Sequence, residues 1–268
     1  MKRSILIILA VLLVPIFSKR VSASMTFTSP IYRSYLPIVA APRTRYFAWS
    51  IEWDNRIPAQ LLTLDMRQER QYSCSAQEAA QFASIHPGQL YIACDEPDIN
   101  TAIWPTQRDY AVWYHGYVAT VLAADPTARF SPAGIAWLPG FHFVDYAQAF
   151  YSAYISLYST PPIVHEWRFH VGVFSVDGFD AWSAAMNEAA EWSVSHGAQM
   201  TLGSFGAQSI PRDVDISSLM LRMRDYINSD PRVVSAAWWS MDWQQWNHAL
   251  ELPDGNLSAE GKLYSKWR

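Results

Sequence analysis

Residues 89–98 read QLYIACDEPD, and this stretch decides the fold. The run Leu90–Cys94 is short and apolar, as a buried strand is, and it ends abruptly at Asp95, Glu96 and Pro97. Proline stops a strand from continuing because it has no N–H to donate to a neighbouring strand. In a parallel barrel the carboxyl ends of the strands meet at one open face, so we expect both acids to lie there.

Strand-like runs alternate with longer amphipathic runs along the rest of the chain. We expect strands near 46–51, 61–64, 90–94, 129–135, 163–170, 200–202 and 233–240, and helices near 76–85, 107–124, 146–158, 179–196 and 215–227. This rhythm predicts an α/β fold with a parallel sheet, and a (β/α)8 TIM barrel is the leading interpretation. An open doubly wound sheet is the alternative. Seven strands are found where a barrel needs eight, and the missing one belongs before Glu96, so the N-terminal half is abbreviated or a further strand lies within 60–74.

The N-terminus has the features of a secretory signal peptide. Basic residues precede an apolar run over 5–17, and small residues end at Ala23, where a signal peptidase would cleave. An uncleaved anchor is the alternative, but the run is shorter than the roughly 20 residues that span a bilayer. We therefore expect a signal peptide over 1–23, a tether over 24–42 and one domain over 43–268. The protein should be secreted or at the cell surface, with no membrane span after cleavage.

Composition excludes some classes of function and leaves others open. The formal net charge is −4, and nucleic-acid binding needs a basic surface. Two cysteines, Cys74 and Cys94, do not make a disulfide scaffold, and both a single bridge and two free thiols remain open. Thirteen Trp and fourteen Tyr fit either an aromatic core or a cleft that stacks on sugar rings. No metal-ligand spacing or nucleotide motif is present, so we expect no cofactor. We also expect a monomer.

Residues 94–98, CDEPD, resemble the Gly-Asn/Asp-Glu-Pro-Asp segment of clan A retaining glycoside hydrolases. Further segments follow in the family's order, including AWWS at 237–240 and LPDGNL at 252–257, so that the resemblance covers most of residues 45–268. It implies a TIM barrel that acts on O-glycosidic bonds of a polysaccharide or oligosaccharide. Glu96 would be the acid/base, and Asp95 would replace the Asn that contacts the sugar 2-hydroxyl. Because the charge of each carboxylate disfavours ionisation of the other, the pair of Asp95 and Glu96 should keep one proton available near neutral pH, as a general acid requires.

Other substrate-binding candidates come from the same resemblance. Residues 167–172, WRFHVG, are similar to the family's "FHvY" segment, which implies that His170 lies in the sugar site; a hydrogen-bonded core histidine is the alternative. Trp238 and Trp239 point to opposite faces of their strand, so only one of them can line the mouth as a sugar platform. Trp49, on the first strand, is another candidate.

The main departure from the family concerns the nucleophile. Residues 200–206, MTLGSFG, resemble the family's "LTEFG", and Ser204 stands where the nucleophilic Glu belongs. Retaining hydrolysis needs two carboxyl groups about 5–5.5 Å apart, and a serine without a base is a poor nucleophile. Standard double displacement is therefore doubtful unless Asp242, Glu166 or Glu52 replaces the missing carboxylate.

Three hypotheses follow from these patterns. The first is a glycoside hydrolase that works through Glu96 and a second carboxylate. The second is a catalytically inactive relative that binds carbohydrate. A serine hydrolase at Ser204 is disfavoured because Leu202 breaks the Gly-x-Ser-x-Gly pattern. A metal pair at His165 and Glu166 is disfavoured because adjacent strand residues point to opposite faces.

Overall fold

The structure is a computed structural model, and it describes residues 45–48, 70–137, 142–207, 209–238, 248–250, 252 and 256–267. The chain divides into two units, and every described residue belongs to Ala40–Arg268. The proposed signal peptide and tether lie outside the described residues.

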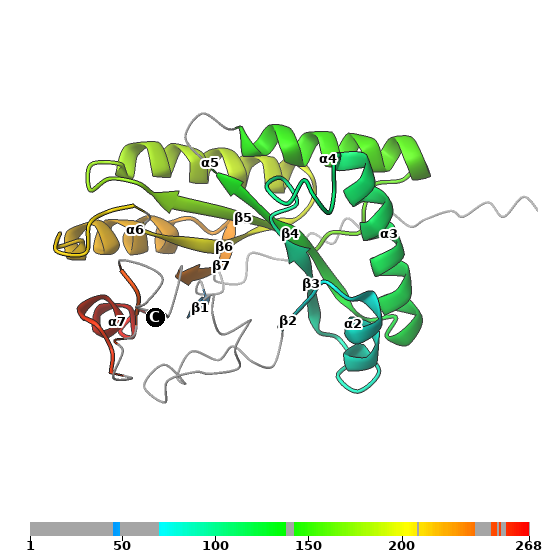
Figure 1. The fold of residues 1–268 in the computed structure, drawn as a ribbon, viewed down its shortest axis with the longest axis horizontal. Helices are drawn as coiled ribbons and strands as arrows, with labels where there is room; N and C mark the ends of the chain where they lie inside the picture. The colour runs from blue at the N-terminus through cyan, green and yellow to red at the C-terminus, as the bar shows by residue number, and fades with distance from the viewer. Residues whose placement is uncertain are drawn as a thin grey trace, which may run out of the picture. The chain divides into compact units, whose positions relative to one another are not determined.

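The described strands form one parallel sheet of seven (Figure 1). They are β1 (Arg45–Ala48), β2 (Arg70–Ser73), β3 (Leu90–Asp95), β4 (Arg129–Trp137), β5 (Glu166–Val173), β6 (Gln199–Ala207) and β7 (Val233–Trp238). Their order in the sheet is β1-β7-β6-β5-β4-β3-β2, and every pair is parallel. From β2 to β7 the order follows the chain without reversal, and β1 pairs with β7. A doubly wound sheet reverses its order part-way, so that alternative does not describe this sheet.

A helix follows each strand from β2 to β7. They are α2 (Ala76–Ala83), α3 (Gln107–Ala124), α4 (Phe143–Tyr158), α5 (Phe179–Ser195), α6 (Ser217–Ser229) and α7 (Ala259–Tyr264). Consecutive helices from α2 to α6 contact one another, as their order beside the strands in Figure 1 indicates. Helix α3 begins where the sequence predicts, since Thr106 and Asp109 form a reciprocal capping box. Helix α7 was not predicted because six residues are too few to display a helical period.

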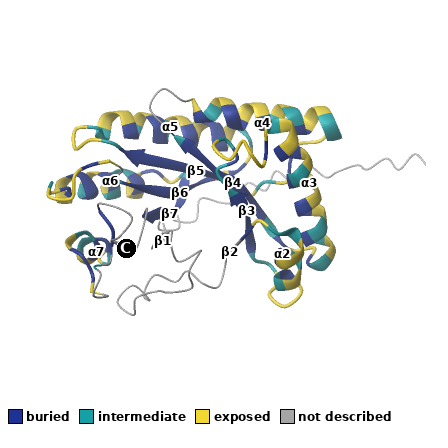
Figure 2. Cartoon of the chain, viewed as in Figure 1, coloured by how far each residue is buried: buried dark blue, intermediate teal, exposed yellow. Residues whose placement is uncertain are grey.

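Strand β5 shows how the two faces of the sheet differ. Trp167 and Phe169 point outward, where they pack on aromatic rings of α4 and α5. Arg168 and His170 point to the opposite face, which we call the inner face, and they contact polar atoms of other strands. Figure 2 accordingly shows buried strands and helices whose exposed surfaces face away from them. The sequence of β5 therefore alternates polar and apolar residues, and both sets are buried because both faces of the strand are covered.

Most expected strands coincide with observed ones, with differences at their ends. Strand β2 falls within 60–74, where a further strand was considered, whereas the strand expected at 61–64 lies outside the described residues. Strand β6 runs to Ala207, five residues beyond its expected end. Its pairing with β5 continues beyond a register shift, in which Gly203 is the extra residue of a β-bulge. No helix among the described residues has both the length and the apolar character to cross a bilayer.

Candidate functional site

The carboxyl end of β3 departs from regular strand geometry. Cys94 and Glu96 have positive φ angles of 66° and 42°, which is uncommon for residues other than glycine. Beside them, Pro132 in β4 has no N–H for the ladder. The hydroxyl of Tyr110 bridges this gap, since it accepts a hydrogen bond from Ala133 N at 2.7 Å and donates one to Ala93 O at 3.1 Å. Helix α3 therefore holds the two strands together immediately before the acidic turn.

A disulfide bond joins Cys74 to Cys94, which settles the question that the sequence left open. It connects the residue after β2 with the irregular end of β3. The bond therefore fixes the backbone one residue before Asp95 and two before Glu96. Its place next to the acidic turn gives it a part in positioning that turn.

His170 brings the two predicted acids together on the inner face. Its Nδ1 lies 2.8 Å from Glu96 Oε1, and its Nε2 lies 3.4 Å from Asp95 Oδ1. The imidazole occupies the volume above Gly134 on β4, where a Cβ atom would overlap it. His170 is 3% exposed, whereas the Glu96 side chain is 26% exposed. The histidine thus forms the buried support of a carboxylate that faces solvent.

The proton in this cluster belongs to the imidazole ring. Burial acts to raise the pKa of Glu96, but the hydrogen bond and the charge of His170 outweigh it, and the pKa lies below its ordinary value. Burial acts to lower the pKa of His170, but Asp95 and Glu96 outweigh it, and that pKa is raised. The expectation that the two acids keep one proton near neutral pH is therefore not met at Glu96, because His170 lies between the two carboxylates and favours the ionised form of Glu96.

Asp98 is a third acid at this site, and the sequence analysis did not assign it a role. Its Oδ2 accepts a hydrogen bond from Ala136 N at 3.0 Å, while the pair His170 and Ala136 is in register between β5 and β4. Burial raises the pKa of Asp98 to about 7, although the Ala136 N–H and the charge of His170 act in the opposite direction. Asp98 is therefore largely protonated below neutral pH. Its position directly after Pro97 in the acidic turn is the sequence feature that could have indicated a role for Asp98 in the site.

The cluster of Asp95, Glu96 and His170 has the composition of a metal site, with ligand atoms within 4.8 Å of one another. However, the two carboxylates approach different nitrogens of the same ring. A histidine ligates a metal through one nitrogen, so carboxylates that help to bind the same ion would gather at that nitrogen. The arrangement fits a protonated imidazole better than a bound cation.

Ser204 lies on the inner face beside His170. The register pairs Phe169 with Leu202 and then His170 with Ser204, so Gly203 is the extra residue of the irregularity. Ser204 is 1% exposed, and its Oγ has no hydrogen-bond partner within the described part of the chain. A buried hydroxyl without a partner costs about 1–3 kcal/mol. No carboxylate of β6 stands in its place, because Gln199–Ala207 contains none.

Glu166 is not the second carboxylate at the mouth. It precedes His170 by four residues on β5, which corresponds to about 13 Å along a strand. There it accepts a hydrogen bond from Thr201 Oγ1, which also contacts Ser235 Oγ at 3.1 Å. Glu166 therefore belongs to a buried polar layer further down the inner face. The other two candidates for a replacement, Asp242 and Glu52, lie outside the described residues.

Trp238 is the member of the tryptophan pair that packs against a helix. It is 1% exposed, its Nε1 donates to His248 O at 3.0 Å, and its ring packs on Tyr264 of α7. Trp238 therefore offers no open ring face to a sugar, and its assignment as a substrate platform is withdrawn. Trp239 and Trp49 lie outside the parts whose side chains the structure describes.

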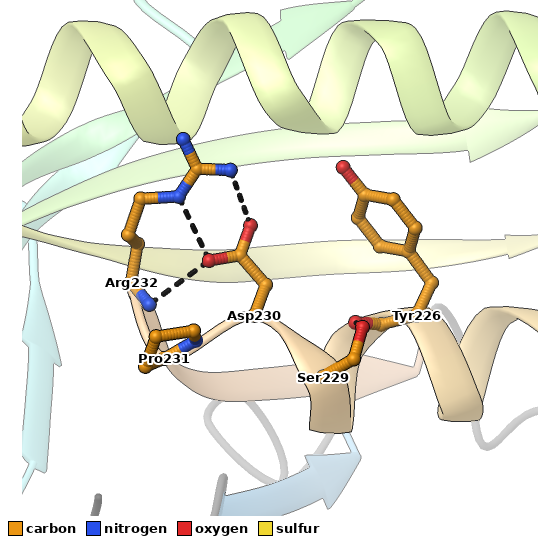
Figure 3. Close-up of a pocket in the computed structure, with 5 residues that line it drawn as sticks. All are labelled: Tyr226, Ser229, Asp230, Pro231 and Arg232. Atoms are coloured by element: carbon orange, nitrogen blue, oxygen red, sulfur yellow. Dashed lines mark hydrogen bonds and ion pairs between the residues drawn. The ribbon is translucent and has the colours of Figure 1, made fainter.

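Figure 3 shows a pocket that does not include the acidic turn. It is lined by Tyr226, Ser229, Asp230, Pro231 and Arg232, which precede β7, whereas Glu96 follows β3. The two places therefore lie at opposite ends of a parallel sheet. Figure 3 shows Arg232 and Asp230 paired with each other, at 2.6 Å, so the pocket's charges are already satisfied. In barrel enzymes this end of the strands serves stability rather than chemistry.

Comparison with known proteins gives a fold but not a family. The sequence has no match among protein-family profiles or among curated proteins. Among solved structures it is similar to a GH128 (subgroup II) endo-β-1,3-glucanase from Sorangium cellulosum, with a TM-score of 0.62, 18% identity, 85% of this chain covered and 92% of the other. The corresponding enzyme from Pseudomonas viridiflava gives a TM-score of 0.63 and 16% identity, covering 85% and 98%.

A third similar structure contains a ligand. It is a subgroup I enzyme of the same kind from Amycolatopsis mediterranei, in complex with laminaripentaose, with a TM-score of 0.61, 12% identity, and 84% and 90% of the two chains covered. At these identities the likeness establishes a glycoside hydrolase fold for this chain. It does not establish clan membership or the replacement of a nucleophile at Ser204.

Proposed function

We propose that this protein is a secreted, glycoside-hydrolase-like protein that acts on the O-glycosidic bonds of β-1,3-glucan, with Glu96 as the acid/base. The observation that carries the proposal is the contact between Glu96 and His170 at the carboxyl end of a parallel strand. The β-1,3-glucan specificity is taken from the similar structures, which are β-1,3-glucanases and include a complex with laminaripentaose.

The fold proposed for this function is a closed (β/α)8 barrel, abbreviated in its N-terminal half. The pairing of β1 with β7 and the uninterrupted order from β2 to β7 support it, because both are features of a singly wound barrel. Closure would join β1 to β2. In such a barrel Asp95, Glu96, His170 and Ser204 all belong to the face at which barrel enzymes carry out chemistry.

Acid/base work at Glu96 follows from its hydrogen bond to His170. His170 Nδ1 lies 2.8 Å from Glu96 Oε1, so the pair can deliver a proton through the carboxyl group to a glycosidic oxygen and take it back. Asp95 stabilises the cationic ring from its other side and is proposed to contact the substrate. Trp239 and Trp49 remain the proposed aromatic platforms for sugar rings.

The test is hydrolysis of a linear β-1,3-glucan by the purified full chain, measured as reducing ends and as oligosaccharide products. We expect turnover that falls by about 10²–10⁴-fold in Glu96→Gln, since the variant loses acid/base catalysis. Glu188→Gln, an exposed change on α5, is the matched control and should retain wild-type turnover. Equal rates in both variants would place the chemistry elsewhere.

A second function is favoured by Ser204. The strand that pairs with β5 presents a hydroxyl in register with His170, and standard double displacement then lacks its nucleophile. The alternative is therefore a catalytically inactive protein that binds β-1,3-glucan through the same site. Calorimetric titration with laminaripentaose distinguishes it, because binding without any turnover supports this alternative and the absence of binding contradicts both functions.

A further inference from the structure

Ser204 carries the inference, because its hydroxyl is a buried hydrogen-bond donor on the inner face with no partner in the described part of the chain. Phe205 packs outward on Trp238 and on Trp267, so its neighbour Ser204 faces the same side as His170. Register-paired residues on adjacent strands lie about 4.8 Å apart. The hydroxyl is therefore placed beside the cluster that contains Glu96 and suits an acceptor supplied by a ligand.

Glu96 stands on the other side of His170 as a base. The imidazole leans over Gly134 toward β3, where it holds the carboxylate in its ionised form. The resting site thus combines a partly exposed carboxylate with a neutral hydroxyl donor, and no carboxylate of β6 faces that donor. This is the reverse of what double displacement needs, which is a protonated acid opposite an ionised nucleophile.

We propose that the site catalyses glycosyl transfer from an α-configured glucosyl donor with a small anionic leaving group to a hydroxyl of a β-1,3-glucan acceptor, inverting the anomeric centre. Glu96 is the base toward the acceptor, and the Ser204 hydroxyl donates a hydrogen bond to the departing anion. The proposal rests on the second function proposed above, the binding of β-1,3-glucan without its hydrolysis.

The step balances without a further reactant. The acceptor hydroxyl gives its proton to the Glu96 carboxylate while its oxygen forms a bond to the anomeric carbon. The bond from that carbon to the leaving group breaks on the opposite face, and its electron pair leaves with the anion, for example fluoride. Glu96 then releases the proton to solvent, so the net products are a β-linked oligosaccharide and the acid of the leaving group.

Serine at position 204 suits this reaction better than glutamate would. A carboxylate there would repel a departing anion and would itself attack the anomeric carbon. A hydroxyl donates to the anion and leaves the β-linked product intact, because that product is attacked only by a competent nucleophile. The buried hydroxyl and the ionised Glu96 thereby acquire complementary roles.

The test supplies the full-length protein with α-glucosyl fluoride and laminaritriose. Fluoride release is followed with an ion-selective electrode, and the linkage of the product is determined by NMR. We expect fluoride release that depends on laminaritriose and yields a β-1,3-linked product. Ser204→Ala should slow it by about tenfold, as loss of one hydrogen bond to a charged group does. Glu96→Gln should slow it at least 100-fold.

Controls separate this proposal from the glucan specificity on which it rests. Ser218→Ala, an exposed change on α6, should transfer at the wild-type rate. Ser204→Glu should begin to hydrolyse the product, and circular dichroism verifies that each variant is folded. Laminaritriose binding measured by calorimetry, without acceptor-dependent fluoride release, overturns the transfer reaction and leaves glucan binding standing. The absence of laminaritriose binding overturns both.

Discussion

Gly134 is the residue on which the position of His170 depends. The imidazole fills the space that a side chain at 134 would occupy, and from there it reaches both Asp95 and Glu96. A glycine in a strand weakens it unless something else packs into the vacant volume. Here that volume holds the group that sets the charge of Glu96.

The first prediction is that Gly134→Ala displaces the imidazole. The added methyl group overlaps the His170 ring, so we expect a loss of about 1–3 kcal/mol in unfolding free energy and at least a tenfold loss of glucan turnover or binding. Chemical denaturation and calorimetry measure the two effects. Gly116→Ala is the control, because its Cβ meets nothing within 4 Å on α3, and it should stabilise the protein by up to about 1 kcal/mol.

At the scale of single residues, Glu96 and His170 could be predicted from the sequence, but the contact between them could not. The motif placed both residues at the mouth, whereas the charge on the imidazole depends on two carboxylates that meet it only in the folded chain. The raised pKa of Asp98 could not be predicted, because it results from burial against β4. The sequence could not show which of Trp238 and Trp239 packs against a helix. The alternation of side chains along a strand places the two rings on opposite faces, but it does not identify the face that a helix covers.

The pairing of β3 with β4 shows how helix α3 supports the site. Pro132 pairs in register with Ala93, next to the irregular Cys94, and the Tyr110 hydroxyl of α3 hydrogen-bonds to Ala93 O and Ala133 N at this point. The same end of β3 is tied to the end of β2 by the disulfide bond. The two supports act at Ala93 and Cys94, within three residues of Glu96.

The second prediction concerns the Tyr110 hydroxyl. Tyr110→Phe leaves Ala133 N without its buried partner, so the free energy of unfolding should fall by about 1–3 kcal/mol. Tyr146→Phe is the matched control, since the Tyr146 hydroxyl is also buried but has no hydrogen-bond partner in the described part of the chain. Its removal should cost far less. Equal losses in the two variants would refute the bridging role.

The third prediction concerns the disulfide bond. Cys74→Ser opens a loop with a sequence separation of 20, and a closed loop of that length contributes about 3 kcal/mol. We also expect weaker glucan binding, because Cys94 adjoins the acidic turn. Denaturation with and without a reductant measures the first effect: reductant should destabilise the wild type and leave Cys74→Ser unchanged. A wild type that does not respond to complete reduction would contradict it.

Elements were predictable where local chemistry marks their ends. The capping box at Thr106 fixed the start of α3, and an apolar run before acidic residues fixed β3. Strand β6 was predicted too short because the extra residue at Gly203 breaks the two-residue period on which strand prediction depends. The register that brings Ser204 beside His170 arises from pairing between strands, and a single strand's sequence does not contain it.

At the scale of the whole molecule, the site's charges make stability depend on pH. Asp98 has a pKa raised to about 7, and His170 has a raised pKa, so both bind protons more tightly in the folded protein. Their contributions are present at low pH and are lost as the pH rises through the folded values. Carboxylates with lowered pKa act in the opposite direction and lose their contribution in acid; they are Glu96, Asp125, Asp215, Asp230 and Glu260.

The fourth prediction is maximal stability between about pH 4 and 6. The thermal midpoint should be several degrees higher near pH 5.5 than at pH 8, because over that interval the folded protein binds protons at Asp98 and His170 more tightly than the unfolded chain does. Asp98→Asn removes one of these groups and keeps an oxygen for Ala136 N, so the difference between the two midpoints should shrink. Asp177→Asn, an exposed change, should leave it unaltered. A midpoint that rises from pH 5.5 to pH 8 would contradict the assignment.

The most direct test of the central claim is a crystal structure of Glu96→Gln with laminaritriose at a concentration that saturates binding. The account predicts a glucose ring at the carboxyl end of β3, with its glycosidic oxygen within about 3.2 Å of the residue 96 amide and its α face toward Ser204. An oligosaccharide bound elsewhere on the molecule, with no sugar in contact with residue 96, would contradict it.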